Sequence, residues 1–117
     1  MIRIDAIIRP ERVNIVLESM AKAGCTGFTY SNVSGRGTQK GVEVFTGRGS
    51  SMTNRVSLPK VLVTAVVEKA NQKKIVESII SAAKTSINGE IGDGKIFISE
   101  ISDVIRVRTG DSGTDAL

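Results

Sequence analysis

Three short segments carry residue types that can bind an anion such as a phosphate. The first, residues 35–41, reads Gly-Arg-Gly-Thr-Gln-Lys-Gly and begins like a dinucleotide-binding fingerprint. A site of that type needs a helix directly after the glycines, because the helix N-terminus holds the pyrophosphate. Residues 42–46, Val-Glu-Val-Phe-Thr, have an extended pattern instead. The sequence therefore does not predict a Rossmann-type site.

The second segment, residues 89–96, reads Gly-Glu-Ile-Gly-Asp-Gly-Lys-Ile. It has the spacing of a nucleotide P-loop, but Ile96 stands where such a loop has Ser or Thr for magnesium. Glycines still allow backbone N–H groups to converge on an anion, and Lys95 adds a positive charge. The segment predicts a phosphate nest and not a P-loop NTPase.

The third segment is the pair Arg106 and Arg108 in the alternating run 104–108. On a strand, residues two apart point to the same face. Two neighbouring guanidinium groups repel each other unless an anion lies between them, and arginine binds phosphate oxygens as a fork. Two solvated arginines at a strand edge are the alternative; Lys95 and the two glycine segments favour the anion site.

Composition excludes several classes of function. The chain has 117 residues, no histidine and one cysteine. The lack of histidine removes His-based nucleophile triads and most zinc sites. Cys25 cannot form an intramolecular disulfide, so we interpret it as a small buried residue at a helix–strand junction and expect a cytoplasmic protein. The longest apolar run, residues 61–67, is too short to cross a membrane, so no membrane insertion is expected.

The net charge of +4 favours anionic partners. A sheet that binds RNA needs several stacking aromatic residues on neighbouring strands, and this chain has three Phe and one Tyr, widely spaced. Long runs of basic residues are also missing. We therefore interpret the charge as local anion sites and expect no nucleic-acid partner.

The elements that must position these residues form two strand–helix–strand units. Strand patterns occupy residues 2–8, 26–34, 60–67 and 95–101, with a further alternating run at 104–108. Pro10 begins the first helix and Gly24 ends it, whereas Asn71 is predicted to cap the second. Apolar residues recur at helical spacing at Val13, Val16, Leu17, Met20 and Ala21, and at Ile75, Val76, Ile79, Ile80, Ala82 and Ala83.

Two such units predict an α+β fold: a ferredoxin-like double βαβ, with a four-stranded antiparallel sheet and two helices on one face. Strand 60–67 is apolar on both faces apart from Lys60 and Thr64, which indicates burial on both sides in an oligomer. Residues 35–57 are rich in glycine and are predicted to be a structureless functional loop, in which Phe45 could anchor a partner.

Several motifs together resemble those of the PII signal-transduction proteins. They are Ala-Ile-Ile-Arg-Pro at 6–10, Gly-Phe-Thr at 27–29, the glycine segment 35–41, Leu-Pro-Lys at 58–60, Ile-Gly-Asp-Gly-Lys-Ile-Phe at 91–97 and Val-Ile-Arg-Val-Arg-Thr-Gly at 104–110. The resemblance covers nearly the whole chain. It implies one domain, residues 1–117, that forms a homotrimer with nucleotide sites in the clefts between subunits.

The resemblance also divides the chain into functional segments. The T-loop, residues 36–57, would reach a membrane transporter or a cytoplasmic enzyme. The B-loop, residues 86–94, and the C-terminal segment, residues 106–117, would contact the nucleotide. ATP and ADP would compete for the cleft, and 2-oxoglutarate would bind beside ATP and Mg²⁺ at the base of the T-loop.

Carried over by position, the resemblance assigns roles to particular residues. Ile7, Thr29 and Val66 would surround the adenine, and Gly35, Gly37, Thr38 and Gln39 would approach the nucleotide from the base of the T-loop. Gly92, Asp93, Gly94, Lys95 and Phe97 would bind from one subunit, and Arg106 and Arg108 from its neighbour. Gln39 and Lys60 match positions that assist Mg²⁺ and 2-oxoglutarate, with Lys40 and Gly41 beside them. No catalytic residue is implied, and the only metal contact is Gln39, together with the nucleotide phosphates.

The chain departs from the family pattern at two places. Ser50, Ser51 and Met52 stand where many bacterial members have a modified tyrosine. An insertion before residue 91 places the acid Glu90 where a lysine would face the phosphates, so we expect a weakened preference for ATP over ADP. Slow ATP hydrolysis with Asp93 orienting water, and a trimeric module for another small molecule, are the alternative functions.

Overall fold

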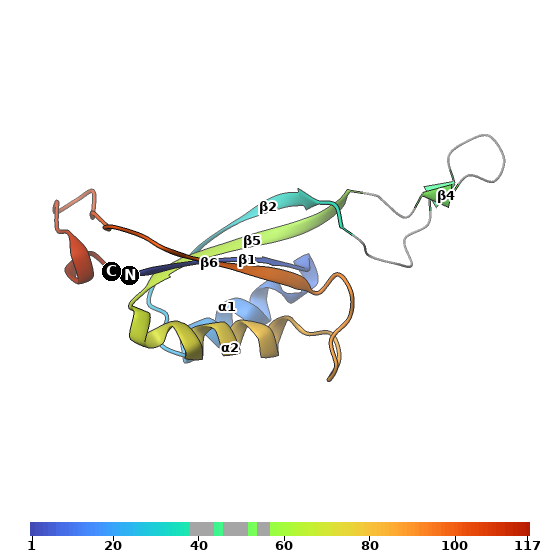
Figure 1. The fold of residues 1–117 in the computed structure, drawn as a ribbon, viewed down its shortest axis with the longest axis horizontal. Helices are drawn as coiled ribbons and strands as arrows, with labels where there is room; N and C mark the ends of the chain where they lie inside the picture. Colours follow the sequence, from blue (N-terminus) through green and yellow to red (C-terminus); the bar gives the residue numbers. More distant parts are fainter. Residues whose placement is uncertain (38–43, 46–51, 54–56) are drawn as a thin grey trace.

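The fold is a single antiparallel sheet with both helices on one face. The computed structural model describes residues 1–37, 44–45, 52–53 and 57–117. The strand order is β2 (Thr29–Gly35), β5 (Leu58–Val67), β1 (Ile2–Ile8) and β6 (Gly94–Glu100). Helices α1 (Val13–Lys22) and α2 (Gln72–Ala83) lie together below this sheet (Figure 1). The predicted ferredoxin-like double βαβ fold is confirmed.

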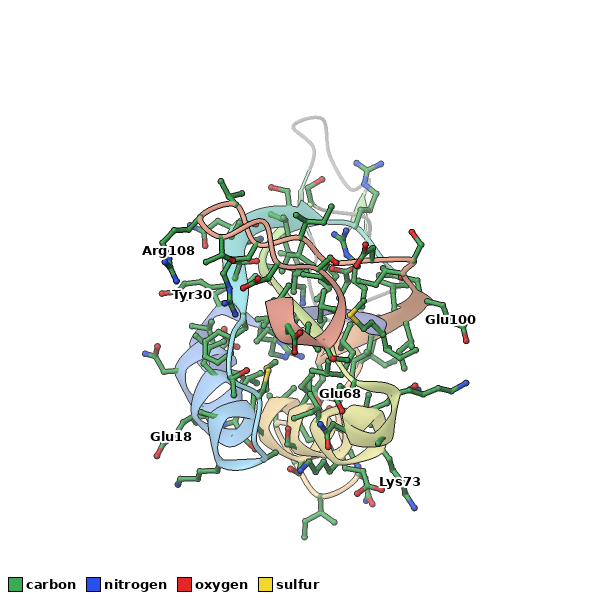
Figure 2. The ribbon with its side chains drawn as sticks, turned by 90° about the vertical axis from the view of Figure 1, so that its left-hand side faces the viewer. Glu18, Tyr30, Glu68, Lys73, Glu100 and Arg108 are labelled. Atoms are coloured by element: carbon green, nitrogen blue, oxygen red, sulfur yellow. The ribbon has the colours of Figure 1, made fainter. Side chains whose placement is uncertain are left out.

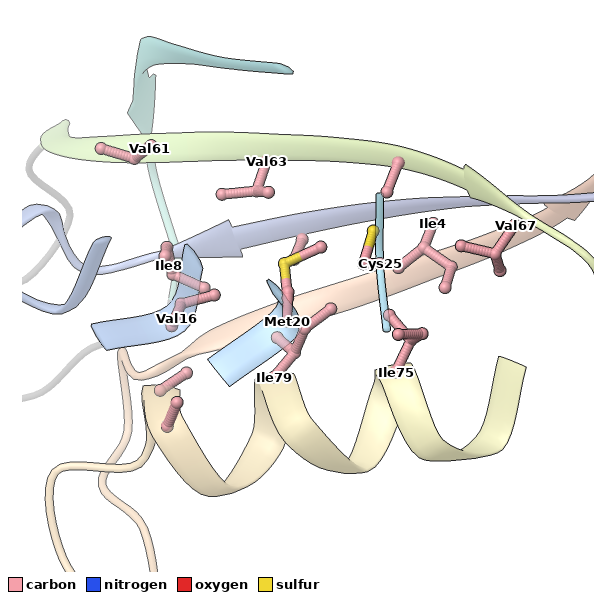
Figure 3. Packing of buried hydrophobic residues seen from close by; sticks show 14 of the residues in the cluster. Ile4, Ile8, Val16, Met20, Cys25, Val61, Val63, Val67, Ile75 and Ile79 are labelled. Carbon is pink, nitrogen blue, oxygen red and sulfur yellow. The ribbon is translucent and has the colours of Figure 1, made fainter. Parts of the chain in front are cut away.

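The core lies between the sheet and the helices. Charged side chains such as Glu18, Lys73 and Glu100 extend away from the ribbon (Figure 2). Alternate residues of β1 and β5 point inward and are buried, and they meet Val16 and Met20 of α1 and Ile75 and Ile79 of α2 (Figure 3). Burial of this apolar surface is the main force that holds the helices on the sheet.

Of the capping residues predicted for the helices, the structure confirms some and not others. Gly24 ends α1 with a φ of +95°, as its predicted role requires. The predicted side-chain cap by Asn71 is wrong, because no such bond forms at the start of α2. Arg12 instead caps the other end of α2, where its Nε and Nη2 donate to the Ala82 carbonyl at 3.0 and 2.7 Å. Ala21 and Ile80, which belong to the predicted apolar stripes of the two helices, are exposed.

Cys25 matches its interpretation as a small buried residue. Its side chain belongs to the hydrophobic core, and its Sγ lies 3.5 Å from the Gly27 carbonyl. Burial raises the pKa of the Cys25 thiol, against a smaller opposing effect of that hydrogen bond. The neutral thiol is therefore a packing group with little nucleophilic character.

Pairing in the sheet shifts the boundaries of three strands from their predicted positions. β2 begins at Thr29 and not at residue 26, because pairing with β5 begins at Thr29 opposite Thr64. β5 begins two residues earlier than predicted, since Leu58 pairs with Gly35. β6 begins and ends one residue earlier than predicted, at Gly94 and Glu100. On β5 the inward residues are buried and the outward ones half-buried, so burial of both faces in an oligomer stays a prediction.

The prediction of a strand at residues 104–108 is wrong. Only one bridge, between Ile105 and Ser112, forms there, and the Arg106 N–H donates to the Asp111 carbonyl at 2.8 Å to close a turn. The Asp103 carboxylate accepts the Gly113 N–H at 2.9 Å and holds a short 3-10 helix, η3 (Gly113–Ala116), against this turn. Because local side-chain bonds replace strand pairing, alternation does not place Arg106 and Arg108 on one face.

Within the T-loop, the structure describes two short strands. β3 (Val44–Phe45) and β4 (Met52–Thr53) pair antiparallel, so the prediction of a structureless loop is wrong for these residues. Thr38, Gln39, Lys40, Gly41, Ser50, Ser51 and the Phe45 side chain lie outside the described residues. In the ranges that are described, no helix is long and apolar enough to cross a bilayer.

Gly94 is a test of how the B-loop enters the sheet. Its φ is +133°, and a Cβ there would overlap the Ile7 carbonyl oxygen of β1. We expect Gly94→Ala to lower the free energy of unfolding by about 3 kcal/mol, from backbone strain and steric overlap. Urea unfolding measures this. Gly27→Ala is the control, because a Cβ there meets nothing within 4 Å. Equal unfolding midpoints for the two variants would contradict the close approach.

Candidate functional site

The Asp93 carboxylate is the centre of the B-loop. One of its oxygens accepts Arg9 Nε at 2.9 Å and Thr85 Oγ1 at 2.8 Å. The other accepts the backbone N–H groups of Thr85 at 3.1 Å and Glu90 at 2.8 Å. The backbone groups of this glycine segment were predicted to meet an external phosphate. Instead, the Glu90 N–H of that segment and the Thr85 N–H just before the B-loop meet the chain's own carboxylate, which preorganises the loop.

These hydrogen bonds keep Asp93 ionised. Burial raises the pKa of Asp93, whose side chain is only 14% exposed. The N–H groups of Glu90 and Thr85, the Thr85 hydroxyl and the Arg9 guanidinium outweigh burial and hold the pKa of Asp93 well below its usual range. The carboxylate is therefore a structural anion whose oxygens already hold four donors.

Two cations connect the B-loop to the sheet. Arg9, directly after β1, also donates from Nη2 to the Ile91 carbonyl at 3.1 Å. Lys60 Nζ, at the start of β5, donates to the Gly92 carbonyl at 2.6 Å. Burial first, and then the neighbouring Arg9 charge, lower the pKa of Lys60. Since β5 follows directly after the T-loop, Lys60 joins the base of the T-loop to the B-loop.

A cavity of about 650 Å³ opens beside the B-loop. Four predicted nucleotide-binding residues line it: Ile7, Asp93, Gly94 and Lys95. Its apolar wall includes Val76 and Ile80 of α2 and Ile98 of β6. Ile7 and Lys95 are direct partners in the β1–β6 pairing, which puts an apolar and a cationic residue side by side. The volume lies in the range of small-molecule pockets.

Of the other predicted residues, those that the structure describes do not line this cavity within one chain. Val66 lies opposite Arg3, about 13 Å along β1 from Ile7 at roughly 3.3 Å per residue. Thr29 pairs with Thr64, and Gly35 packs against the Lys60 side chain. Gly92 contributes its carbonyl to Lys60, and Gly37 is exposed at the edge of the described residues. Phe97 is 54% exposed on β6.

The two arginines of the C-terminal segment are apart from the cavity lining as well. Arg106 pairs with Asp111 at 3.5 Å, and Arg108 lies in an exposed turn whose side chain extends outward (Figure 2). The residues predicted for Mg²⁺ and 2-oxoglutarate, apart from Lys60, lie outside the described residues. In the described part of the chain no group of three or more Cys, Asp or Glu residues could hold a metal ion.

Sequence reasoning missed the roles of Arg9 and Thr85. Arg9 was noted only as part of the motif at residues 6–10. It meets Asp93 across 84 positions of sequence, and no local pattern reveals such a contact. Thr85 could have been found from its position just after the second helix pattern, because a hydroxyl there can donate to a carboxylate that follows in the chain.

The Asp93 network makes a testable prediction about the B-loop. In Asp93→Asn, one oxygen and the charge are lost, so the Thr85 and Glu90 amides should exchange hydrogen about 10- to 100-fold faster. The low pKa means that this protection is complete above the unfolded value of about 3.9 and is lost as the pH falls towards the folded value. Asp115→Asn is the charge-matched control. Unchanged exchange at both amides in Asp93→Asn would refute the network.

Comparison with known proteins completes the identification. The chain matches the family model described as "Nitrogen regulatory protein P-II" over residues 1–111. It is 43% identical to Nitrogen regulatory protein P-II 2 of Methanothermobacter thermautotrophicus, covering 100% of this chain and 97% of that one. It is 44% and 42% identical to the P-II proteins of Microchaete diplosiphon and Rhizobium meliloti, with full coverage of both chains in each case. Similarity of this extent, on the expected fold, shows that the chain belongs to the nitrogen regulatory protein P-II family of signal-transduction regulators.

Proposed function

We propose that this chain binds ATP or ADP beside the B-loop and uses the T-loop to regulate a membrane transporter or a cytoplasmic enzyme of nitrogen metabolism. The observation that carries the proposal is the bond from Lys60 to the Gly92 carbonyl. It connects the start of β5, where the T-loop ends, to the loop that would hold phosphates. A ligand that displaces or reinforces this bond acts on both loops.

The cavity supports the nucleotide half of the proposal. Its lining combines apolar residues with Lys95 of the edge strand β6, a composition that suits a ligand with both an apolar base and a charged phosphate chain. The Asp93 network fixes the B-loop in advance, so little ordering of the loop is needed on binding. Mg²⁺ would accompany ATP through the phosphates and Gln39.

A homotrimer would complete the site. Thr29, Val66, Arg106 and Arg108 do not line the cavity in one chain, so we propose that they reach it from a neighbouring subunit. Arg106 would then exchange its exposed partner Asp111 for phosphate oxygens. Exposed pairs of this kind stabilise a protein by at most about 1 kcal/mol, so a phosphate can replace the carboxylate readily.

The proposed signal is a change in the T-loop that follows ligand binding. A ligand shifts such an equilibrium only if it binds one loop state better than the other. Lys60 can provide this difference, because its ammonium group can bond either to Gly92 or to an added anion. We propose 2-oxoglutarate as that second anion, with Gln39, Lys40 and Gly41 beside it. Hydrolysis of ATP is less well supported, because the Asp93 oxygens already hold four donors.

Calorimetric titration with ATP and ADP, each with Mg²⁺, tests the proposed function. We expect micromolar dissociation constants, or about −8 kcal/mol. Lys95→Gln should weaken binding about tenfold or more, because it removes a charged contact to phosphate. Lys73→Gln is the matched control: it lies at the far end of α2 from the B-loop (Figure 1).

The same titration, repeated with 2-oxoglutarate present, tests whether this acid is the second effector. Tighter ATP binding in the presence of 2-oxoglutarate, lost in Lys60→Gln, would support the proposed second anion. Absence of heat with either nucleotide would reject the nucleotide proposal and favour a module for another small molecule.

A further inference from the structure

A second hollow, of about 500 Å³, lies beside the last turns of α2. Glu77, Ile80 and Lys84 recur at helical spacing in and just after α2 and form one wall of it. Arg12, directly before α1, and Ile87 of the B-loop also line it. Ile80 and Lys84 line the 650 Å³ cavity as well, but Arg12, Glu77 and Ile87 do not. The hollow is therefore a separate feature of the surface.

A closed turn presents Ile87 to solvent. The Gly89 N–H donates to the Ser86 carbonyl at 3.0 Å, and Gly89 has the φ of +72° that such a turn requires. The Asp93 carboxylate accepts a backbone N–H group on each side of this turn, at 3.1 and 2.8 Å. The Ile87 side chain is nevertheless 94% exposed. A large apolar side chain on a preorganised loop loses little entropy when a partner covers it, so Ile87 has the properties of an interface anchor.

The charges around the hollow favour an anionic partner. The Arg12 guanidinium is fixed in place, because its Nε and Nη2 donate to the Ala82 carbonyl at 3.0 and 2.7 Å. Within the described ranges of the chain, neither Arg12 nor Lys84 forms an ion pair with a carboxylate. Glu77 is the carboxylate among the lining residues, so two cations face one anion. The net charge of the lining is positive, and a partner with carboxylates would complement it.

The hollow lies at the end of the domain from which the T-loop departs. The T-loop is enclosed by the end of β2 at Gly35 and the start of β5 at Leu58. Both are at the same end of the sheet as the last turn of α2 (Figure 1). A protein that contacts the T-loop can therefore reach the hollow without extending along the whole sheet.

We propose that this hollow is a docking surface for a protein segment in which an apolar side chain is flanked by carboxylates. The apolar side chain packs against Ile80 and Ile87, and the carboxylates pair with Lys84 and Arg12. An apolar contact beside a fixed arginine, sheltered from water, is a typical centre of binding energy in an interface. That the segment belongs to the protein regulated through the T-loop rests on the proposed function, whereas the surface itself does not.

Titration of the full chain, followed by nuclear magnetic resonance, tests this surface without any nucleotide. The probe is a hexapeptide of alternating Asp and Leu, blocked at both ends. In two comparison peptides, Lys replaces each Asp or Ser replaces each Leu. We expect the Asp–Leu peptide to shift the amide signals of residues 81–87 with a dissociation constant on the order of 1 mM. Each comparison peptide should bind at least about threefold more weakly, because it lacks either the charge or the apolar contact.

Matched variants assign the contacts. Ile87→Ser should weaken binding of the Asp–Leu peptide about tenfold, since the apolar contact is lost. Ile91→Ser is its control: Ile91 is in the same loop and 58% exposed, but does not line the hollow. Lys84→Gln should weaken binding about threefold, and Lys73→Gln, at the other end of α2, is its control. Glu77→Gln should tighten binding about twofold, because it removes the opposing charge.

The docking surface is overturned if the Asp–Leu peptide shifts no amide of residues 81–87, or if the Lys–Leu peptide binds equally well. It is also overturned if Ile87→Ser has no more effect than Ile91→Ser. The calorimetric titration with nucleotides is an independent measurement. A chain that binds the peptide as expected but gives no heat with ATP or ADP keeps the docking surface and loses the nucleotide proposal, and the reverse result does the opposite. All the substituted side chains are exposed, and circular dichroism checks that each variant is folded.

Discussion

The local structure of the candidate site depends on one half-buried anion, the Asp93 carboxylate. Its four donors come from the end of β1, the end of α2 and the B-loop itself. By fixing Asp93, these bonds place Gly94 where β6 must begin, at a distance from Ile7 that admits no side chain. The start of β6 at Gly94 in turn places Lys95 opposite Ile7. Removing one partner would leave a desolvated charge, so the network holds as a unit.

The same region would join the proposed binding site to the proposed signalling loop. Arg9 and Lys60 leave the sheet from β1 and β5 and both reach carbonyls of the B-loop. Lys60 is the third residue of β5, the strand that follows the T-loop, and its bond to the Gly92 carbonyl joins the start of that strand to the B-loop. The proposed coupling would pass through a sheet with a close-packed core. Such a core deforms little, so a displacement of Lys60 would be transmitted to its neighbours.

The sequence was sufficient for the fold but only in part for the site. Alternation in residues 2–8 and helical spacing in residues 75–83 predicted a strand and a helix, and both elements formed, although Ile80 of the helical stripe is exposed. The run at 104–108 alternates equally well, yet Asp103 and Asp111 bond locally and turn the chain there. Glycines and Lys95 predicted a phosphate site, which stays a prediction; the structure shows instead that the chain's own Asp93 carboxylate is bound in this loop, with Arg9, 84 positions away, among its donors. Contacts between distant residues leave no local pattern.

The central claim is that ligand binding at the B-loop is coupled to the T-loop through Lys60. Hydrogen–deuterium exchange of the full chain, with and without MgATP, measures this most directly. The account predicts that exchange changes together in the B-loop and in residues 36–57, and that Lys60→Gln removes the change in residues 36–57 while keeping that in the B-loop. A B-loop response with no T-loop response in the unmodified chain, or an unaltered T-loop response in Lys60→Gln, would contradict it.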